Sequence, residues 1–227
     1  QNSDFAILYR TNAQSRSFED ALRKKNISYR VYGGLSFYQR KEIKDVLAYL
    51  RLLINPDDEQ AFKRIINFPA RGIGQTTLNK IAIEAKNSSV SDYIFIKDLL
   101  KSSEILNNST KNKLLDFVIM IESIKNKTEH ADVFDITKEV LKQSGLYNLY
   151  KNDESLEGIN RIQNIEELLN GIKDFVENNE KSQASVSSFL QDVALATDQD
   201  NDTNDNNKVS LMTVHLAKGL EFPYVYI

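Results

Sequence analysis

The order of apolar patterns along the chain constrains its fold more than any other feature. Continuous apolar runs stand near both ends, at Phe5–Tyr9 and Tyr224–Ile227, and a further strand-like segment covers residues 208–213. Such short runs are typical of strands buried on both faces of a parallel sheet. The long stretch between them has helical periodicity instead. The sequence therefore predicts a mainly α fold, in which a helical domain is inserted into a truncated α/β domain with a parallel sheet.

The first 34 residues have the pattern of a β–α–β unit. Thr11 and Asn12 are good N-caps for a helix through about Lys25. The alternating segment at residues 29–32 predicts a second strand, which Gly33-Gly34 ends. Because the strand pattern begins almost at the first residue and stops at the last, we expect a piece of a longer protein.

From Arg40 onward the apolar residues follow a helical period, and the first of these helices stops at Asn55-Pro56. Residues 198–207 are polar throughout and predict a solvated linker. We expect domain segments at residues 1–58, 59–206 and 207–227, the middle one being the helical insertion. Further helices are expected at about 57–67, 75–86, 91–101, 110–126, 132–144, 154–177 and 185–197.

The net charge of −3 conceals an uneven distribution. Residues 10–44 hold nine bases and three acids, a balance of +6, whereas residues 153–205 hold thirteen acids and three bases, a balance of −10. Charge alone favours two solvated faces of opposite sign, although a polyanionic partner for the basic segment fits as well.

Composition also excludes several kinds of protein. The chain has no cysteine and only two histidines, which excludes disulfides and a multi-histidine metal site, so no metal site is predicted. No apolar run has the roughly 20 residues of a membrane span. We therefore expect a cytoplasmic protein without a membrane partner.

Reactive side chains follow two of the predicted strands. Tyr9 and Arg10 close the first strand, and Thr213, His215 and Lys218 follow the strand of residues 208–213. Open parallel sheets bind ligands at the carboxyl ends of their strands. Taken singly, each residue also fits an ordinary packed or solvated role.

Three longer blocks give this arrangement a more specific meaning. Residues 6–16 (AILYRTNAQSR), 31–45 (VYGGLSFYQRKEIKD) and 209–223 (VSLMTVHLAKGLEFP) resemble motif IV, block IVa and motif V of the UvrD/PcrA/Rep family of superfamily-one DNA helicases. The resemblance implies the second RecA-like motor domain of such a helicase, with its accessory domain inserted.

The resemblance implies nucleotide contacts for four residues. Tyr9 would stack on the adenine of ATP, and Arg10 would reach the γ-phosphate as an arginine finger, worth roughly 10³–10⁵ in rate. Glu221, with Gly219, would contact the ribose. The cofactor would be ATP with Mg²⁺, whose ligands we expect outside this chain.

The other matched residues are implied to bind DNA. The single-strand path would be lined by Gly33, Gly34, Arg40, Thr213, His215 and Lys218. Tyr32 and Phe37 could stack on bases, although core packing is at least as good an interpretation for both. A Gly-x-Gly turn that leads into a helix resembles the duplex-gripping turn of the accessory domain, with Arg71, Gly72, Gly74, Thr76 and Thr77 as its residues.

The chain has no phosphate-cradling Gly-x-x-x-x-Gly-Lys-[Ser/Thr] loop and no Walker B pair. The sequence therefore predicts part of an ATP-dependent 3′–5′ DNA helicase that does not hydrolyse ATP by itself. Expected partners are single-stranded DNA, single-strand/duplex junctions, and repair or loading proteins. The alternatives are a helix-hairpin-helix DNA-binding module, a protein-interaction module, and a nuclease-fused helicase relative.

Overall fold

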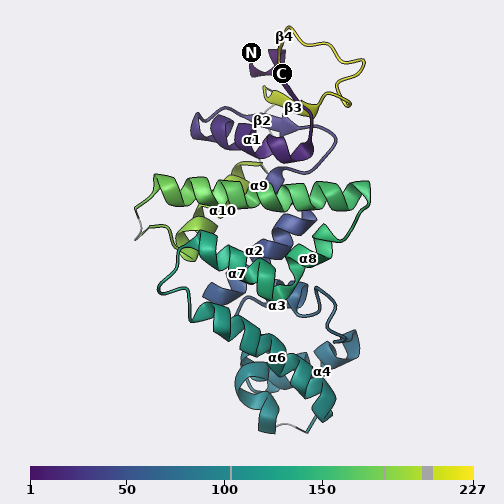
Figure 1. Cartoon of the computed structure of the whole chain (residues 1–227), viewed down its shortest axis with the longest axis vertical. Coiled ribbons are helices and arrows are strands. Elements are labelled where there is room, and N and C mark those ends of the chain that lie inside the picture. Colours follow the sequence, from purple (N-terminus) through teal and green to yellow (C-terminus); the bar gives the residue numbers. More distant parts are fainter. Residues whose placement is uncertain (103, 181–182, 201–206) are drawn as a thin grey trace. The chain divides into compact units, whose positions relative to one another are not determined.

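The computed structural model describes residues 1–102, 104–180, 183–200 and 207–227 (Figure 1). The chain is mainly helical and carries a small parallel sheet, which confirms the predicted fold class. It packs as two compact units. The sheet unit comprises Gln1–Lys44, Tyr150–Asn178 and Ser188–Ile227, and the helical unit comprises Asp45–Leu149 and Asn179–Ser187.

The sheet has four strands in the order β2-β3-β1-β4, and every pairing is parallel. Tyr9 pairs with Thr213 in the register of the two central strands, and Val31 pairs with Leu211 at the edge. The strands β1, β2 and β3 therefore end at the same edge of the sheet. The strands are β1 (Phe5–Tyr9), β2 (Tyr29–Val31), β3 (Val209–Thr213) and β4 (Tyr224–Tyr226).

One face of the sheet is covered by α1 (Ser15–Lys24), which follows β1 after the short 3-10 turn η2 (Asn12–Gln14). Phe18 and Leu22 of this helix pack against the buried side chains Tyr9, Val209 and Leu211. The helix is held on the sheet because packing of the two apolar faces against each other removes apolar surface from water.

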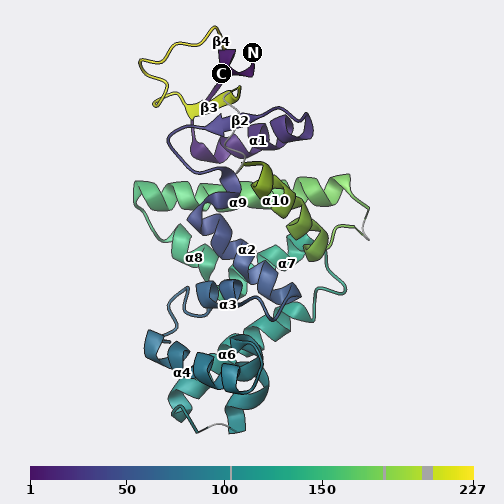
Figure 2. The ribbon, with the colours of Figure 1, turned by 180° about the vertical axis from the view of Figure 1, so that it is seen from behind.

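The sheet unit also contains most of the acidic C-terminal helices. Helix α9 (Leu156–Asn178) contacts η2, and Figures 1 and 2 both show it beside the segment that carries α1. Phe175 of α9 packs edge-to-face on Phe189 of α10 (Val186–Asp200), with the ring centroids 5.5 Å apart. Helix α9 therefore packs with the sheet unit, although the prediction assigned it to the inserted helical domain. The domain boundaries at residues 58 and 206 remain a prediction.

The helical unit is built around buried aromatic side chains. Phe62 packs edge-to-face against Tyr93 and Phe117, at 6.4 and 6.3 Å between centroids. Its elements, of which α2 begins and α8 ends in the sheet unit, are α2 (Lys41–Ile54), α3 (Glu59–Ile65), α4 (Gln75–Asn87), α5 (Asp92–Ile94), the π-helix η4 (Phe95–Leu99), the 3-10 turn η5 (Leu100–Ser102), α6 (Asn108–Lys125), α7 (Val133–Ser144) and α8 (Leu146–Lys151).

The predicted helices are all present, with three differences. The helix expected at 91–101 is divided into α5, η4 and η5. Helix α8 was not predicted, because six residues directly after the cap Gly145 are too few to show a period. The linker predicted at 198–207 coincides partly with the end of α10, and its residues 201–206 lie outside the described residues.

Three charged side chains join α3 to α5. Asp92 N donates to Glu59 Oε1 at 2.8 Å, and Lys63 Nζ lies 3.0 Å from Glu59 and 3.8 Å from Asp92. Burial and the neighbouring Glu59 raise the pKa of Asp92 to about 6, while contacts with the Asp92 amide and Lys63 lower the pKa of Glu59. The folded chain therefore keeps a proton on Asp92 that the unfolded chain releases near pH 4.

This proton makes the stability of the helical unit depend on pH. Between about pH 4.5 and 6 the folded state binds more protons at Asp92, so the Asp92 contribution to the free energy of unfolding falls as pH rises. We expect Asp92→Asn, which mimics the protonated form, to flatten this decline. Urea titrations of both proteins at pH 4.5, 5.5 and 6.5 measure the effect, and parallel pH profiles would contradict it.

Candidate nucleic-acid interface

Three loops meet at the edge where β1, β2 and β3 end. Tyr32 N donates to Leu211 O at 2.8 Å, and Val214 N donates to Tyr9 O at 2.9 Å, so the chain stays paired up to the start of each loop. We call this surface the strand-end edge. It comprises Arg10, Gly33, Gly34, Thr213, His215 and Lys218, so the structure brings together residues predicted from all three sequence blocks. Gly219 and Glu221 lie further along the connection to β4, which begins beside Phe5 at the other end of β1.

At Gly33, the loop after β2 packs against the loop after β3. The φ of Gly33 is +72°, and a Cβ at this position would clash with Cδ1 of Leu216. Glycine is therefore required here both by the backbone conformation and by the close approach of the Leu216 side chain. The contact fixes the loop that carries His215 and Lys218 against the Gly33 turn.

We expect Gly33→Ala to lower the free energy of unfolding by about 1–2 kcal/mol through its left-handed conformation, with an added cost from Leu216. In the double variant Gly33→Ala/Leu216→Ala, only the stability lost to the clash with Leu216 is recovered, because the smaller side chain removes the clash and the left-handed φ is unchanged. Gly34→Ala is the control, since a Cβ there meets no atom within 4 Å. Urea unfolding compares the variants, and equal effects of the two glycine substitutions would contradict the account.

The charged side chains of this edge are exposed. Arg10, His215 and Lys218 all face solvent, as does Glu221 on the connection to β4. Within the described residues, neither the Arg10 guanidinium nor the Lys218 ammonium forms an ion pair. The Arg10 backbone is fixed, because its N–H donates to Gln14 Oε1 at 2.9 Å. This arrangement offers free cationic groups on an ordered backbone.

Tyr9 lies under the edge rather than on it. Its side chain is 4% exposed, and its ring is stacked on Phe18 with the centroids 6.2 Å apart. Burial, and secondarily the nearby Glu19, raise the pKa of its hydroxyl to about 12. Stacking on an adenine therefore requires one face of this buried ring to become exposed, and that role stays a prediction.

Arg40 is likewise placed inside the unit, at 8% exposure. Its guanidinium donates to Ser15 Oγ at 2.6 Å and to Asn164 Oδ1 at 2.9 Å, and burial lowers its pKa. The arrangement does not present Arg40 to a DNA strand, because the donors that would reach a phosphate are bonded within the protein. Phe37 is fully buried, as its core interpretation requires, and Tyr32 is 40% exposed.

The helical unit carries the predicted Gly-x-Gly turn. Asn67 Oδ1 accepts from Arg71 N at 2.9 Å and from Ile73 N at 3.1 Å, which folds the backbone around a single amide. Gly74 is the N-cap of α4 and makes no side-chain capping bond. The exposed residues of the turn are Gly72, whose φ is +69°, Gly74 and Thr76, with Thr77 half-buried behind them.

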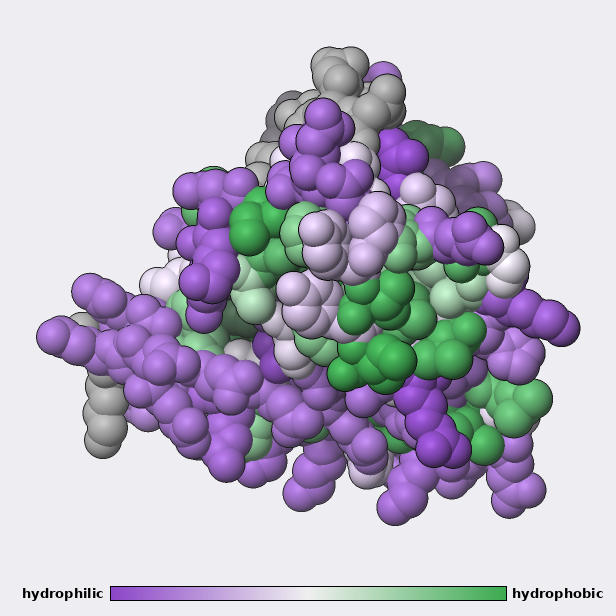
Figure 3. Space-filling model, turned by 90° about the horizontal axis from the view of Figure 1, so that it is seen from above, coloured by the Kyte–Doolittle hydropathy of each residue, from purple (hydrophilic) through white to green (hydrophobic). Residues whose placement is uncertain are grey.

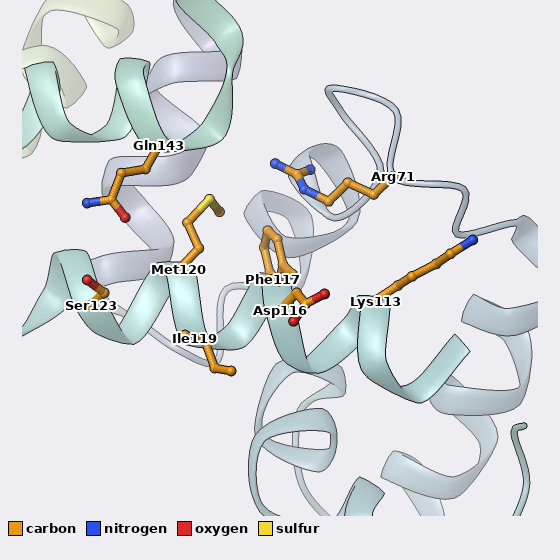
Figure 4. A pocket seen from close by; sticks show the side chains of 8 residues that line it. All are labelled: Arg71, Lys113, Asp116, Phe117, Ile119, Met120, Ser123 and Gln143. Atoms are coloured by element: carbon orange, nitrogen blue, oxygen red, sulfur yellow. The ribbon is translucent and has the colours of Figure 1, made fainter. Parts of the chain in front are cut away.

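Arg71 does not lie on this exposed side. Its Nη1 donates to Ile65 O at 2.8 Å, its Nη2 donates to Tyr49 Oη at 2.7 Å, and its guanidinium lies 5.2 Å from the Phe117 ring centroid (Figure 4). The geometry thus makes Arg71 a support for the turn. The side-chain contacts of Arg71 indicate this supporting role, and they do not indicate the predicted direct contact with DNA.

Three residues that organise these surfaces were not predicted from the sequence. Asn67 precedes Phe68-Pro69 by one residue, and asparagine near proline is a turn signal that could have indicated it. Leu216 and Asn164 act through partners distant in sequence, so no local pattern indicates them.

Other surface features are less specific. Beside Arg71, a hollow of about 550 Å³ is lined largely by α6 side chains, among them Lys113 and Ile119 (Figure 4). Figure 3 shows apolar side chains gathered among hydrophilic ones on one face, and Leu220 and Tyr226 are among the exposed apolar residues of the sheet unit. In the described part of the chain, no cluster of three acidic, histidine or cysteine side chains is arranged to hold a metal.

None of the helices in the described ranges combines the length and apolarity that crossing a membrane requires.

The fold is a small parallel α/β sheet joined to a large helical portion, with three motif-bearing loops at one sheet edge. Residues 1–227 match the UvrD-like helicase C-terminal domain, and the chain belongs to this family. It is 41% identical over 233 residues to ATP-dependent DNA helicase PcrA of Bacillus subtilis (strain 168). It is 40% identical to the proteins of the same name from Staphylococcus aureus (strain Mu50) and Staphylococcus epidermidis (strain RP62A).

Each alignment covers 99% of this chain but only 30–31% of the relative. The chain therefore spans about a third of the length of these curated relatives.

Proposed function

We propose that the chain is part of an ATP-dependent DNA helicase and that its strand-end edge binds single-stranded DNA. The observation that carries the proposal is the convergence of three separate sequence blocks, with Arg10, His215 and Lys218 exposed, on one edge of a parallel sheet. Ligands of open α/β sheets bind at this edge. The named activity of the matching relatives supports the same function.

The chemistry of the edge suits a phosphate backbone. Arg10 and Lys218 can neutralise phosphates, and the exposed glycines Gly33 and Gly34 let a strand approach the main-chain amides. Such contacts bind DNA without reading its sequence. Travel along a strand requires sequence-independent contacts of this kind.

Arg10 has two candidate ligands, a DNA phosphate and the γ-phosphate of ATP. Its position beside Thr213 and Val214 favours DNA, because the loop with His215 and Lys218 begins there. The burial of Tyr9 points the same way, since an adenine site next to Arg10 has no free aromatic face. We therefore assign Arg10 to the single strand and retain the arginine finger as the competing outcome of its test.

Two other predicted nucleotide contacts, Glu221 and Gly219, lie on the connection from β3 to β4. Glu221 is exposed and chemically able to accept hydrogen bonds from ribose hydroxyls, and Gly219, with a φ of +86°, leaves its backbone accessible. These two residues fit ATP, whereas Tyr9 fits it only after moving. We propose that the Mg²⁺ ligands lie outside the described residues.

A second DNA contact is proposed at the turn of Gly72–Thr77. The first turn of α4 has no side-chain cap, and the flanking glycines are exposed, so its N–H groups can bind a duplex phosphate. Single-strand/duplex junctions would engage both surfaces. The 3′–5′ direction, a role in DNA repair or replication, repair or loading proteins as partners, and a cytoplasmic location follow from the resemblance alone.

Anisotropy titrations of the intact protein with single-stranded, blunt duplex and forked DNA test the proposal, together with ATPase assays with and without DNA. We expect single-stranded and forked DNA to bind, the fork most tightly, and single strands to stimulate ATP hydrolysis. Preference for blunt duplex would favour a helix-hairpin-helix module instead. Absence of binding to all three would favour a protein-interaction module.

A further inference from the structure

A buried polar cluster lies behind the strand-end edge. Arg40 donates to Ser15 Oγ and Asn164 Oδ1, and Asn164 Nδ2 donates to Glu42 Oε1. All four residues are at most 8% exposed. We call Ser15, Arg40, Glu42 and Asn164 the α9 hub, because Asn164 belongs to α9 and the other three belong to the basic N-terminal segment.

The hub supports the loop after β1. Ser15 begins α1 and follows Gln14, whose Oε1 accepts from the N–H groups of Arg10 and Thr11 at 2.9 and 3.0 Å. The bond of 2.6 Å from Arg40 to Ser15 Oγ therefore holds the turn from which Arg10 projects.

The hub supports the loop after β2 as well. Arg40 Nε donates to Leu35 O at 3.4 Å, and the Arg40 guanidinium lies 5.1 Å from the centroid of the Phe37 ring. Phe37 N donates to Glu19 Oε2 of α1 at 3.1 Å. These contacts fix the segment that directly follows Gly33 and Gly34.

A second arginine joins the same helix to the basic segment. Arg16 lies 2.8 Å from Glu167 and 3.3 Å from Asp174, both on α9, and is 7% exposed. Gly171 makes room for it, because a Cβ there would lie 2.6 Å from Arg16 Nη1. The basic and acidic segments are thus bound to each other here and are not merely two solvated faces of opposite sign.

We propose that Arg40 and Asn164 are positioning residues, through which α9 sets the placement of the Arg10 and Gly33 loops for single-stranded DNA. The inference rests on the proposed function of the strand-end edge. It assigns to α9, a helix from the acidic segment, control over the affinity of a surface that it does not itself form. Neither residue contacts DNA.

Asn164→Leu tests this role in the intact protein, because leucine keeps the volume and removes both hydrogen bonds. We expect single-stranded DNA to bind about tenfold more weakly at every salt concentration, the scale expected for a lost bond to a charged group. The slope of log affinity against log salt stays unchanged, because no phosphate contact is lost. Asn160→Leu is the matched control, since Asn160 is exposed one turn earlier on α9. Equal affinities of the two variants would overturn the inference.

Arg40→Lys provides the second test. A lysine keeps the charge but cannot reach Ser15, Asn164 and Leu35 together, so we expect a loss of affinity similar to that of Asn164→Leu, with an unchanged salt slope. Wild-type affinity in Arg40→Lys would overturn the inference. Thermal melting identifies a variant that fails to fold. If Asn164→Leu fails to fold, the affinity of Arg40→Lys for single-stranded DNA tests the inference instead.

The controls separate this inference from the function on which it rests. If the wild-type protein does not bind single strands, the proposed function fails. If it binds them and Lys218→Ala reduces the salt slope, while Asn164→Leu and Arg40→Lys behave as wild type, the positioning role alone fails.

Discussion

The double variant Arg10→Ala/Lys218→Ala of the intact protein is expected to bind single-stranded DNA about a hundredfold more weakly at low salt. Each substitution removes one charge-assisted phosphate contact, worth about tenfold in affinity. The slope of log affinity against log salt is expected to become shallower by about 1.4, because each contact on a single strand contributes about 0.7. Anisotropy titrations at several salt concentrations measure both quantities.

The matched control is Lys24→Ala/Lys25→Ala, which removes the same charge from exposed residues at the far end of α1. We expect this control to lose little affinity, because α1 starts at the strand-end edge and runs back along the sheet. Equal losses in both double variants would indicate diffuse electrostatic binding. If Arg10→Ala alone abolished ATP hydrolysis and spared DNA binding, Arg10 would be an arginine finger and our assignment would be wrong.

Arg71→Ala is expected to have the largest effect on stability, lowering the free energy of unfolding of the helical unit by roughly 3 kcal/mol. The substitution leaves the carbonyls of Ile65, Ile66 and Pro69 and the hydroxyl of Tyr49 without this donor, and it removes the contact with Phe117. Urea or thermal unfolding, followed by circular dichroism, measures the change.

Two further variants show whether the geometry of Arg71 matters. Arg71→Lys should recover only part of the loss, because an ammonium cannot replace a planar fork of donors. Arg51→Ala, at an exposed ion pair with Asp58, should cost less than about 1 kcal/mol. An Arg71→Ala variant as stable as Arg51→Ala would contradict the role of Arg71 as the support of the turn.

Local pattern was sufficient to predict most elements of this fold. The uninterrupted apolar run at Phe5–Tyr9 and the helical stripe after Arg40 predict β1 and α2, because each periodicity reflects burial of one element. The cap at Gly145, whose φ is +81°, was predicted for the same kind of reason, since only glycine adopts this conformation without cost. The strand ends then placed Arg10, Gly33 and Thr213 at one edge of the sheet.

Whether an individual arginine side chain faces solvent or the protein interior could not be predicted in this way. Arg10 and Arg40 both look like phosphate ligands in the sequence, yet one is exposed and the other bonds Asn164, which is 124 residues away. Arg71 looks like a DNA contact because of the neighbouring glycines, but its partners Tyr49 and Phe117 come from other helices. Long-range polar pairing depends on tertiary packing, and a single sequence carries no local signal for it.

Site-directed photo-crosslinking tests the central claim most directly. A photoreactive side chain is introduced in the intact protein at Gly34 or Leu220 beside the exposed loops, or at Glu166 on α9 as an exposed control. We predict crosslinks to a labelled single-stranded oligonucleotide from positions 34 and 220, competed by unlabelled single strands, and none from position 166. Crosslinks from position 166 alone, or from none of the three under conditions where DNA binds, would show that the strand-end edge is not the DNA-binding surface.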